Sequence, residues 1–290
     1  MPGFIDLHTH TSASDGTDSP EELVALAASA GLDAVAVTDH DTVSGLHEAV
    51  TAGKRHGIAV VRGCELAVAS PYGEVHILGL WLPEDPARLA SALEGIRAAR
   101  DDRNREMVEM FRRAGFAVTY PELLAVAAGE SVGRPHMARL LVQKGVCAST
   151  REAFAKYLGD GKGMYVPRVL PSPKEGLALL LAEGATTVLA HPMLIKAPLP
   201  ELEILVGKLA AMGLDAVEAY YSEHDATATR RAKKLAERFG LGLSGGSDYH
   251  GAVRPDVTLG TVWNGNRIPV DVLDALLERR ARQGLPLYGA

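Results

Sequence analysis

The sequence predicts an α/β fold in which largely parallel strands alternate with helices and close into a barrel. Short apolar segments recur along the chain, with the uniform apolar character of strands that are buried on both faces. Segments of helical length separate them, and two of these begin with the helix-start pattern Ser-Pro-Xaa-Glu, at Ser19 and Ser172. A length of 290 residues fits one such barrel. An open, doubly wound sheet is the alternative arrangement.

The composition is that of a globular protein, with 47% hydrophobic and 23% charged residues. The net charge of −6 gives no general electrostatic attraction to duplex DNA, so we expect no duplex partner. Two cysteines are too few for a disulfide framework or a cysteine zinc site. The longest apolar run, residues 177–182, is too short to cross a membrane, and the first residues lack a secretion signal. We therefore expect a cytoplasmic protein.

Four strands are predicted in the first part of the chain, over residues 3–8, 34–38, 58–66 and 74–80. Helices are expected between them, from Pro20 to Gly31 and from Val43 to His56. A turn at Pro71-Tyr72-Gly73 separates the third and fourth strands, which suggests that the fourth returns antiparallel.

The same rhythm resumes after residue 170, and it supplies three more strands. A helix capped by Ser172 ends near Gly184, and strands follow over residues 187–190, 215–219 and 242–246. Seven apolar strands favour a barrel over an open sheet. The segment Gly245-Gly246 lacks the lysine of a phosphate loop. We therefore interpret these two glycines as positions without a side chain that leave space beside the backbone.

The rhythm is interrupted between the fourth and fifth strands, where only helical patterns occur. A long helix is expected over residues 86–114, and shorter ones after Pro121, Pro135 and Ser149. We therefore predict a barrel made of residues 1–85 and 169–290, which holds a metal site, and a helical insert of residues 86–168, which serves as a substrate-binding cap.

Residues that bind metals recur where the predicted strands end, and these ends converge on one face of a barrel. His8 and His10 are two apart on an extended segment, so both imidazoles point the same way. The complete set is His8, His10, Asp15, His40, Glu65, His76, His191, Asp248 and His250. Because a catalytic ion takes about three protein ligands, these nine residues predict two to three divalent ions. The donor types suit manganese, zinc or iron.

These motifs resemble those of the PHP (polymerase and histidinol phosphatase) family of metal-dependent phosphoesterases. The matching segments are His8-Thr9-His10-Thr11, Asp15-Gly16, Thr38-Asp39-His40-Asp41, Glu65, His76, His191-Pro192 and Ser247-Asp248-Tyr249-His250. The resemblance implies a distorted seven-stranded barrel with a trinuclear metal site. It implies that Asp15, a histidine in some branches, places the chain near the branch of 3′,5′-nucleoside bisphosphate phosphatases and a 5′-to-3′ exoribonuclease.

The resemblance also implies how the ligands are shared. His8, His10, Glu65 and Asp248 would hold the first ion, and Glu65 would bridge to the second, held with His76 and His191. Asp15, His40 and His250 would hold the third. Glu65, Asp248 and His250 are the expected catalytic residues, since Asp248 or His250 could relay a proton.

Substrate contacts are expected mainly from the insert. Arg100 and Arg103 share one side of the long helix, and Arg134 and His136 begin a second helix, where guanidinium and backbone N–H groups can hold a phosphate. His40 and His224 complete the predicted substrate-binding set. Solvated helix faces are the alternative interpretation of the arginines.

The sequence thus predicts a phosphoric ester hydrolase in which a metal-bridging hydroxide attacks a nucleotide phosphomonoester. The expected substrates are 3′,5′-nucleoside bisphosphates, losing the 3′-phosphate, and short RNA with a 5′-phosphate. A cyclic phosphodiesterase, a histidinol phosphatase and a non-enzymatic metal-binding regulatory module are the alternatives. Oligomeric state is left open.

Overall fold

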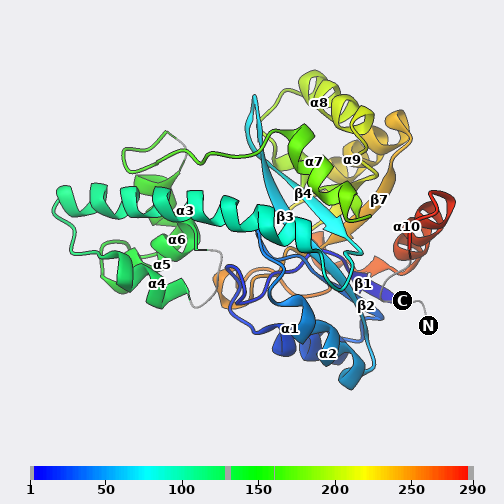
Figure 1. Ribbon diagram of the computed structural model, residues 1–290, viewed down its shortest axis with the longest axis horizontal. Helices are drawn as coiled ribbons and strands as arrows, with labels where there is room; N and C mark the ends of the chain where they lie inside the picture. Colours follow the sequence, from blue (N-terminus) through cyan, green and yellow to red (C-terminus); the bar gives the residue numbers. More distant parts are fainter. Residues whose placement is uncertain (1–2, 128–131, 160, 287–290) are drawn as a thin grey trace.

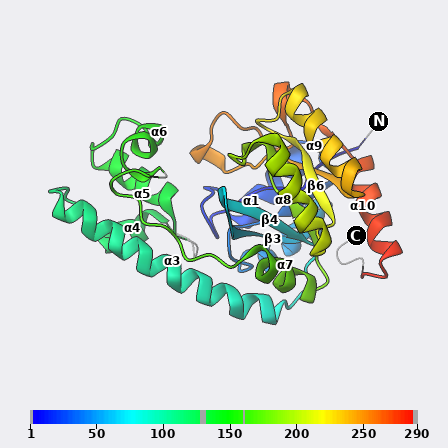
Figure 2. The ribbon, with the colours of Figure 1, turned by 90° about the horizontal axis from the view of Figure 1, so that it is seen from above.

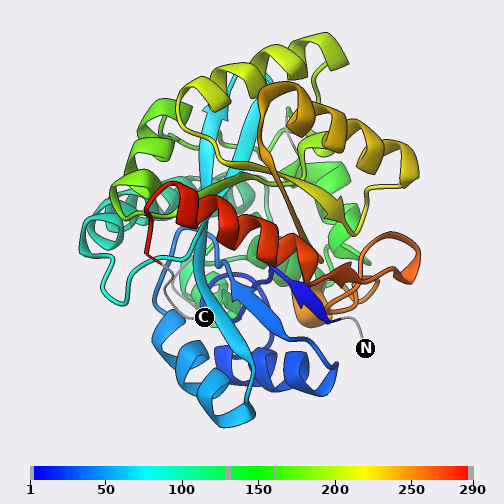
Figure 3. The same cartoon turned by 90° about the vertical axis from the view of Figure 1, so that its right-hand side faces the viewer.

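The computed structural model describes residues 3–127, 132–159 and 161–286. Its centre is one eight-stranded sheet in the order β7-β6-β5-β4-β3-β2-β1-β8, surrounded by helices (Figures 1 and 3). The strands are β1 (Phe4–Asp6), β2 (Ala34–Val37), β3 (Ala59–Ser70), β4 (Gly73–Leu80), β5 (Thr186–Leu189), β6 (Ala216–Tyr221), β7 (Gly242–Gly246) and β8 (Ile268–Pro269).

The sheet nearly closes into a barrel, because the segment of β1 also meets that of β7. The N–H of Leu7 donates to the carbonyl of Gly245 at 3.1 Å, and the N–H of Asp248 donates to the carbonyl of His8 at 2.9 Å. All seven predicted strands are present, and the prediction of a PHP-type barrel is confirmed. The eighth, β8, was not predicted, because a two-residue strand paired antiparallel with β1 leaves no periodic signal.

Strand direction explains why a residue near the beginning of β4 can join residues near the ends of its neighbours. The β3–β4 and β4–β5 pairs are antiparallel, as expected for the first of them, whereas the other pairs among β1 to β7 are parallel. His76, opposite Ala67 in the β3–β4 register, therefore lies at the same end of the barrel as Glu65.

The helices around the barrel are α1 (Pro20–Ser29), α2 (Leu46–His56), α7 (Pro173–Ala182), α8 (Leu199–Ala211), α9 (Ala226–Phe239) and α10 (Asp271–Arg282). Those that follow Ser19 and Ser172 begin as the sequence indicates. Ser19 and Ser172 each form the predicted capping box. Helix α2 starts three residues later than predicted. The Oγ1 of Thr42 accepts the N–H of Ser44 at 3.2 Å, and such a local bond competes with the helix.

Two apolar cores stabilise the barrel. One lies between the strands and the surrounding helices. The other fills the barrel interior, where Val272 and Leu276 of α10 pack against strand residues such as Val61. Helix α10 thus covers the end of the barrel opposite the insert (Figures 1 and 3). The end that faces the insert holds buried polar residues such as Glu65.

The segment between β4 and β5 forms a helical lobe beside the barrel (Figures 1 and 2). Its elements are α3 (Ala87–Arg113), α4 (Tyr120–Ala127), α5 (Arg134–Gln143), α6 (Thr150–Ala153) and the π-helical turn η1 (Phe154–Leu158). Helix α3 joins two cores, because Leu93 packs in the outer core of the barrel and Phe111 packs in a separate core of the lobe. The lobe is therefore held against the barrel by one continuous helix.

None of the helices in residues 3–127, 132–159 and 161–286 is both long enough and apolar enough to cross a membrane. The cytoplasmic location stays a prediction.

The close approach of β7 to β1 gives a test of the barrel closure. A Cβ on Gly246 would lie 2.2 Å from the Cβ of His8 and 2.5 Å from its backbone N. We expect Gly246→Ala to lower the free energy of unfolding by at least 1–3 kcal/mol, on the order of an overpacked core. Gly95→Ala is the control, since nothing lies within 4 Å of its Cβ and it is exposed on α3. The control should gain about 0.5–1 kcal/mol. Equal denaturation midpoints for both variants would contradict the clearance role.

Candidate metal centre

The nine predicted metal ligands meet in one cluster at the end of the barrel that faces the insert. The strand-end segments after β1, β2, β5 and β7 contribute His8, His10, Asp15, His40, His191, Asp248 and His250, while Glu65 and His76 lie within β3 and β4. Strands that are far apart in the sequence thus place their polar residues at the same end of the barrel.

Glu65 lies at the centre of this cluster and is fully buried. Its carboxylate oxygens lie 2.9 Å from ring nitrogens of His40 and His76 and 3.2 Å from Nε2 of His191. Nε2 of His8 lies 3.4 Å from a carboxylate oxygen of Glu65, and Nε2 of His10 lies 3.3 Å from the other. Burial favours the protonated acid, but the nearby imidazoles outweigh it and hold the pKa of Glu65 well below its usual range.

Two further carboxylates extend the cluster on either side. Oδ1 of Asp248 lies 3.1 Å from Nε2 of His10 and 3.4 Å from Nε2 of His8. Oδ1 of Asp15 lies 3.2 Å from Nε2 of His250, and His10 and His40 supply the other nitrogens around it. Ligand atoms of His10, Asp15, His40 and His250 all lie within 4.8 Å of one another.

These residues fit divalent cations. Ligands placed about 2.1 Å from a tetrahedral ion are about 3.4 Å apart, close to the separations around Glu65 and Asp248. Nε2 of His8 and Nε2 of His10 approach to 3.2 Å, an arrangement that a shared cation stabilises. Nδ1 of His10 is buried and has no hydrogen-bond partner among the described residues. The cluster is therefore of the type that holds divalent metal ions.

The ring of His8 is oriented by Glu218, a residue that the sequence did not indicate as part of the site. Oε1 of Glu218 lies 3.0 Å from Nδ1 of His8, which leaves Nε2 facing the cluster, and Oε2 accepts the backbone N–H of His191 at 2.7 Å. Glu218 is fully buried within the apolar strand β6. A lone carboxylate in a buried apolar strand was the signal that could have identified it.

Backbone strain marks two of the predicted ligands. His191 and Asp248 have φ of 30° and 57°, in the left-handed region that few non-glycine residues adopt. Asp248 is held there by the hydroxyl of Tyr221 and by Arg254, which donate to its Oδ2 at 2.8 and 2.7 Å. Strain of this kind persists where the surroundings fix it, and it is common at functional sites.

A cationic cleft of about 160 Å³ lies between this cluster and the insert. Three predicted ligands line it, Asp15, His40 and His76. The other lining residues are Glu74, Arg100, Arg103, Gly133, Arg134, Pro135, Phe154 and Arg168. Three predicted substrate-binding arginines thus line the cleft beside the cluster. Arg168 lies there too, and it was not predicted because its segment has no periodicity.

The arginines differ in what they contact. Arg100 and Arg168 both donate to the buried carboxylate of Asp41, which ties α3 and the segment before α7 to the barrel. Arg103 has no carboxylate partner among the described residues, and its nearest polar contact is Sδ of Met107 at 3.1 Å. It is only 6% exposed, and burial, reinforced by the neighbouring arginines, lowers its pKa to about 9.

The remaining predicted contacts lie outside the cleft. His136 is buried and accepts the N–H of Gly133 through Nδ1 at 3.0 Å, so it caps the start of α5. His224 is buried beside Tyr221, with ring centroids 5.0 Å apart, and its Nδ1 lies 3.2 Å from the carbonyl of Ala219. Neither histidine lines the cleft, and their predicted substrate contacts stay predictions.

A model of the PHP domain matches residues 6–162 of this chain. The 3′,5′-nucleoside bisphosphate phosphatase of Chromobacterium violaceum is 35% identical over 248 residues, covering 85% of this chain and 87% of the relative. The 5′-3′ exoribonuclease of Haemophilus influenzae is 33% identical, covering 86% of this chain and 91% of the relative.

A cyclic phosphodiesterase is also similar. The phosphoribosyl 1,2-cyclic phosphate 1,2-diphosphodiesterase of Eggerthella lenta is 30% identical, covering 85% of this chain and 94% of the relative. Among solved structures, a Bifidobacterium adolescentis protein assigned as a metal-dependent phosphoesterase has a TM-score of 0.85 at 29% identity, with both chains fully covered.

Glu218 provides a test of the cluster that does not depend on turnover. In Glu218→Gln one of the two contacts would be lost, because the amide NH₂ cannot accept a hydrogen bond from either His8 or His191. We expect the affinity for added Mn²⁺ or Zn²⁺ to fall about 10- to 100-fold, as for other residues that orient ligands. The measurement is metal retained during dialysis against graded chelator. Glu237→Gln, exposed on α9, is the control. Unchanged retention would refute the orienting role.

Proposed function

This chain belongs to the PHP domain family, and we propose that it uses the cluster around Glu65 to remove a phosphoryl group from a nucleotide ester. The proposed substrates are 3′,5′-nucleoside bisphosphates, losing the 3′-phosphate, and short RNA with a 5′-phosphate. Two relatives are named for activities on such compounds.

The enzyme class rests on the comparisons. The relatives are named as a phosphatase, an exoribonuclease and a diphosphodiesterase, and a full-length structural neighbour is assigned as a metal-dependent phosphoesterase. The prediction of a phosphoric ester hydrolase of the PHP family is confirmed. The comparisons favour an enzyme over the alternative of a non-enzymatic metal-binding regulatory module.

Arg103 is the observation that carries the substrate proposal. Arg103 is buried and forms no ion pair with a carboxylate among the described residues, although Glu74 lines the same cleft, and three other arginines lie beside it. Such a guanidinium is costly unless an anion enters the cleft. The cleft opens onto predicted metal ligands, so a phosphate bound there would contact both the arginines and the cluster. A planar guanidinium binds phosphate oxygens bidentately, which also orients the ester.

Divalent ions held by the nine ligands would lower the pKa of bound water and neutralise charge on the phosphoryl oxygens. The residues of the chain position this chemistry. Glu218 fixes the tautomer and orientation of His8, while Tyr221 and Arg254 fix Asp248. His250 is buried, with Nδ1 2.9 Å from the carbonyl of Asp248. Asp248 or His250 is the residue that we propose to pass a proton to the leaving oxygen.

The number of ions is part of the proposal. We expect two to three ions per chain after reconstitution with manganese, zinc or iron, measured by elemental analysis. In Glu65→Gln at least one ion should be lost and turnover should fall at least ~10²-fold, since the bridging charge disappears. Glu106→Gln, exposed on α3, should keep both. A single ion in the native chain would sink the multinuclear assignment.

Replacing Arg103 separates a binding role from a structural one. Arg103→Met should raise the melting temperature, because an unpaired buried charge gives way to an apolar side chain. It should lower kcat/KM for a 3′,5′-bisphosphate by about 10- to 150-fold, the value of one charged hydrogen bond. Arg112→Met, on the exposed face of α3, should change neither. A lower melting temperature with unchanged kcat/KM would make Arg103 structural.

The same assay compares substrates. The wild-type protein should prefer bisphosphates and 5′-phosphorylated RNA over p-nitrophenyl phosphate by about tenfold or more, because the cleft arginines hold the phosphate that is not attacked. A cyclic phosphodiester is the second candidate substrate, favoured by the Eggerthella lenta relative. Faster hydrolysis of that diester, or of histidinol phosphate, would replace the nucleotide proposal within the same enzyme class.

A further inference from the structure

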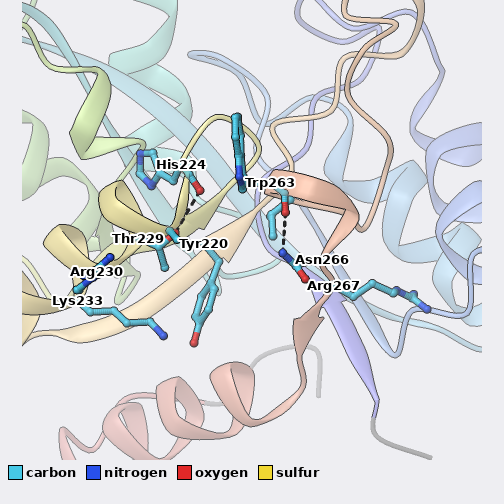
Figure 4. Close-up of a pocket in the computed structure, with 10 residues that line it drawn as sticks. Tyr220, His224, Thr229, Arg230, Lys233, Trp263, Asn266 and Arg267 are labelled. Carbon is cyan, nitrogen blue, oxygen red and sulfur yellow. Dashed lines mark hydrogen bonds between the residues drawn. The ribbon is translucent and has the colours of Figure 1, made fainter.

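A second cavity, of about 520 Å³, lies outside the cationic cleft (Figure 4). Its residues come from β6, α9 and the segment before β8, and they are Tyr220, His224, Ala226, Thr229, Arg230, Lys233, Val262, Trp263, Asn266 and Arg267. None of the nine predicted metal ligands lines it, and neither does any described residue of the insert. The cavity has a size that suits a small ligand.

The charge of this cavity is positive, against the net charge of −6 of the whole chain. Arg230 and Lys233 are three residues apart on α9, so they share one helix face. Neither forms an ion pair with any described residue. Lys233 lies over the ring of Tyr220, with Nζ 4.5 Å from the centroid, a contact that positions the ammonium without neutralising it. No carboxylate is among the described lining residues. These cations can therefore take an anion.

The opposite wall presents an aromatic surface. Trp263 is 48% exposed, although tryptophan residues are on average largely buried. It precedes Asn264 and Gly265, whose φ values of 60° and 73° form a tight turn, and Val262 pairs with Asn266 across it at 2.8 Å. Asn-Gly is the preferred sequence for such a hairpin. The backbone that carries the indole is thus fixed by a tight turn, and the exposed indole is accessible for stacking.

The arrangement in Figure 4 places the two kinds of surface on facing elements. Arg230 and Lys233 lie on α9 at the left, Asn266 lies on the hairpin at the right with Tyr220 between them, and Trp263 projects above Tyr220. Inorganic phosphate alone would leave the aromatic wall uncovered. A neutral aromatic molecule would leave the two cations unpaired. A ligand that joins a planar aromatic ring to a phosphate satisfies both walls.

We propose that this cavity is a second, non-catalytic nucleotide-binding site, in which a nucleobase stacks on Trp263 and its phosphate is bound by Arg230 and Lys233. Base stacking on an aromatic side chain and a charge-assisted phosphate contact are each strong enough to shift affinity by about tenfold or more. The site does not depend on the reaction proposed for the metal cluster, since the two share no lining residue.

Tryptophan fluorescence tests this site directly. The chain has two tryptophans, and the other, Trp81, is 1% exposed and covered by Arg280. Titration with adenosine 5′-monophosphate should therefore give saturable quenching that comes from Trp263 and disappears in Trp263→Phe. Adenosine and inorganic phosphate, titrated separately, should each bind at least about tenfold more weakly, because each engages one wall.

Matched variants separate this site from the cleft. The double variant Arg230→Ala/Lys233→Ala should weaken the quenching at least about tenfold. Lys234→Ala, the exposed neighbour on α9 outside the cavity, should leave it unchanged, as should Arg103→Met in the cleft. The proposal is overturned by absence of saturable quenching, by equal affinity for adenosine, or by equal quenching in the double variant. Loss of quenching in Arg103→Met would assign the binding to the cleft and would also overturn it.

Discussion

The arrangement of the site depends on one buried carboxylate, whose charge must be balanced by the groups around it. Glu65 lies in the interior of β3 with five imidazoles around it, from residues far apart in the sequence. A charge in such a place is tolerated only when opposite charges surround it with good geometry. Every strand-end segment that supplies one of these rings must therefore be placed to within a fraction of an ångström, and the barrel provides that rigidity.

The supporting features follow from this requirement. Glu218 orients the ring of His8 from outside the cluster, and Gly246 leaves the space in which the backbone of His8 can lie. The left-handed backbone of His191 and Asp248 is the conformational strain that accompanies the arrangement. The opposite end of the barrel carries no such demand, so it is closed by apolar contacts with α10.

The insert adds a second group of charged residues, the arginines of α3, above the cluster. Asp41 accepts hydrogen bonds from Arg100 and Arg168, which secures α3 above the cluster. The same helix places Arg103 in the cleft, where no described carboxylate forms an ion pair with it. Neighbouring arginines of one helix thus differ in role, because Arg100 ties the insert to the barrel while Arg103 lines the cleft. Strand β6 has a comparable division, because Tyr221 contacts Asp248 while Tyr220 lines the separate cavity. Adjacent strand residues point to opposite faces.

The sequence by itself determined the α/β class, the seven main strands, the capping boxes and the set of metal-ligand types, because hydrophobic periodicity and helix caps are local signals. It also indicated the helical insert, whose exact boundaries at 86 and 168 stay a prediction. Only the tertiary structure decided that Arg100 is tied to Asp41 while Arg103 is not, and that Glu218 and Arg168 belong to the site. The physical reason is that ion pairing and burial depend on residues that meet only after the strands and the insert have packed, and one sequence carries no record of those distances.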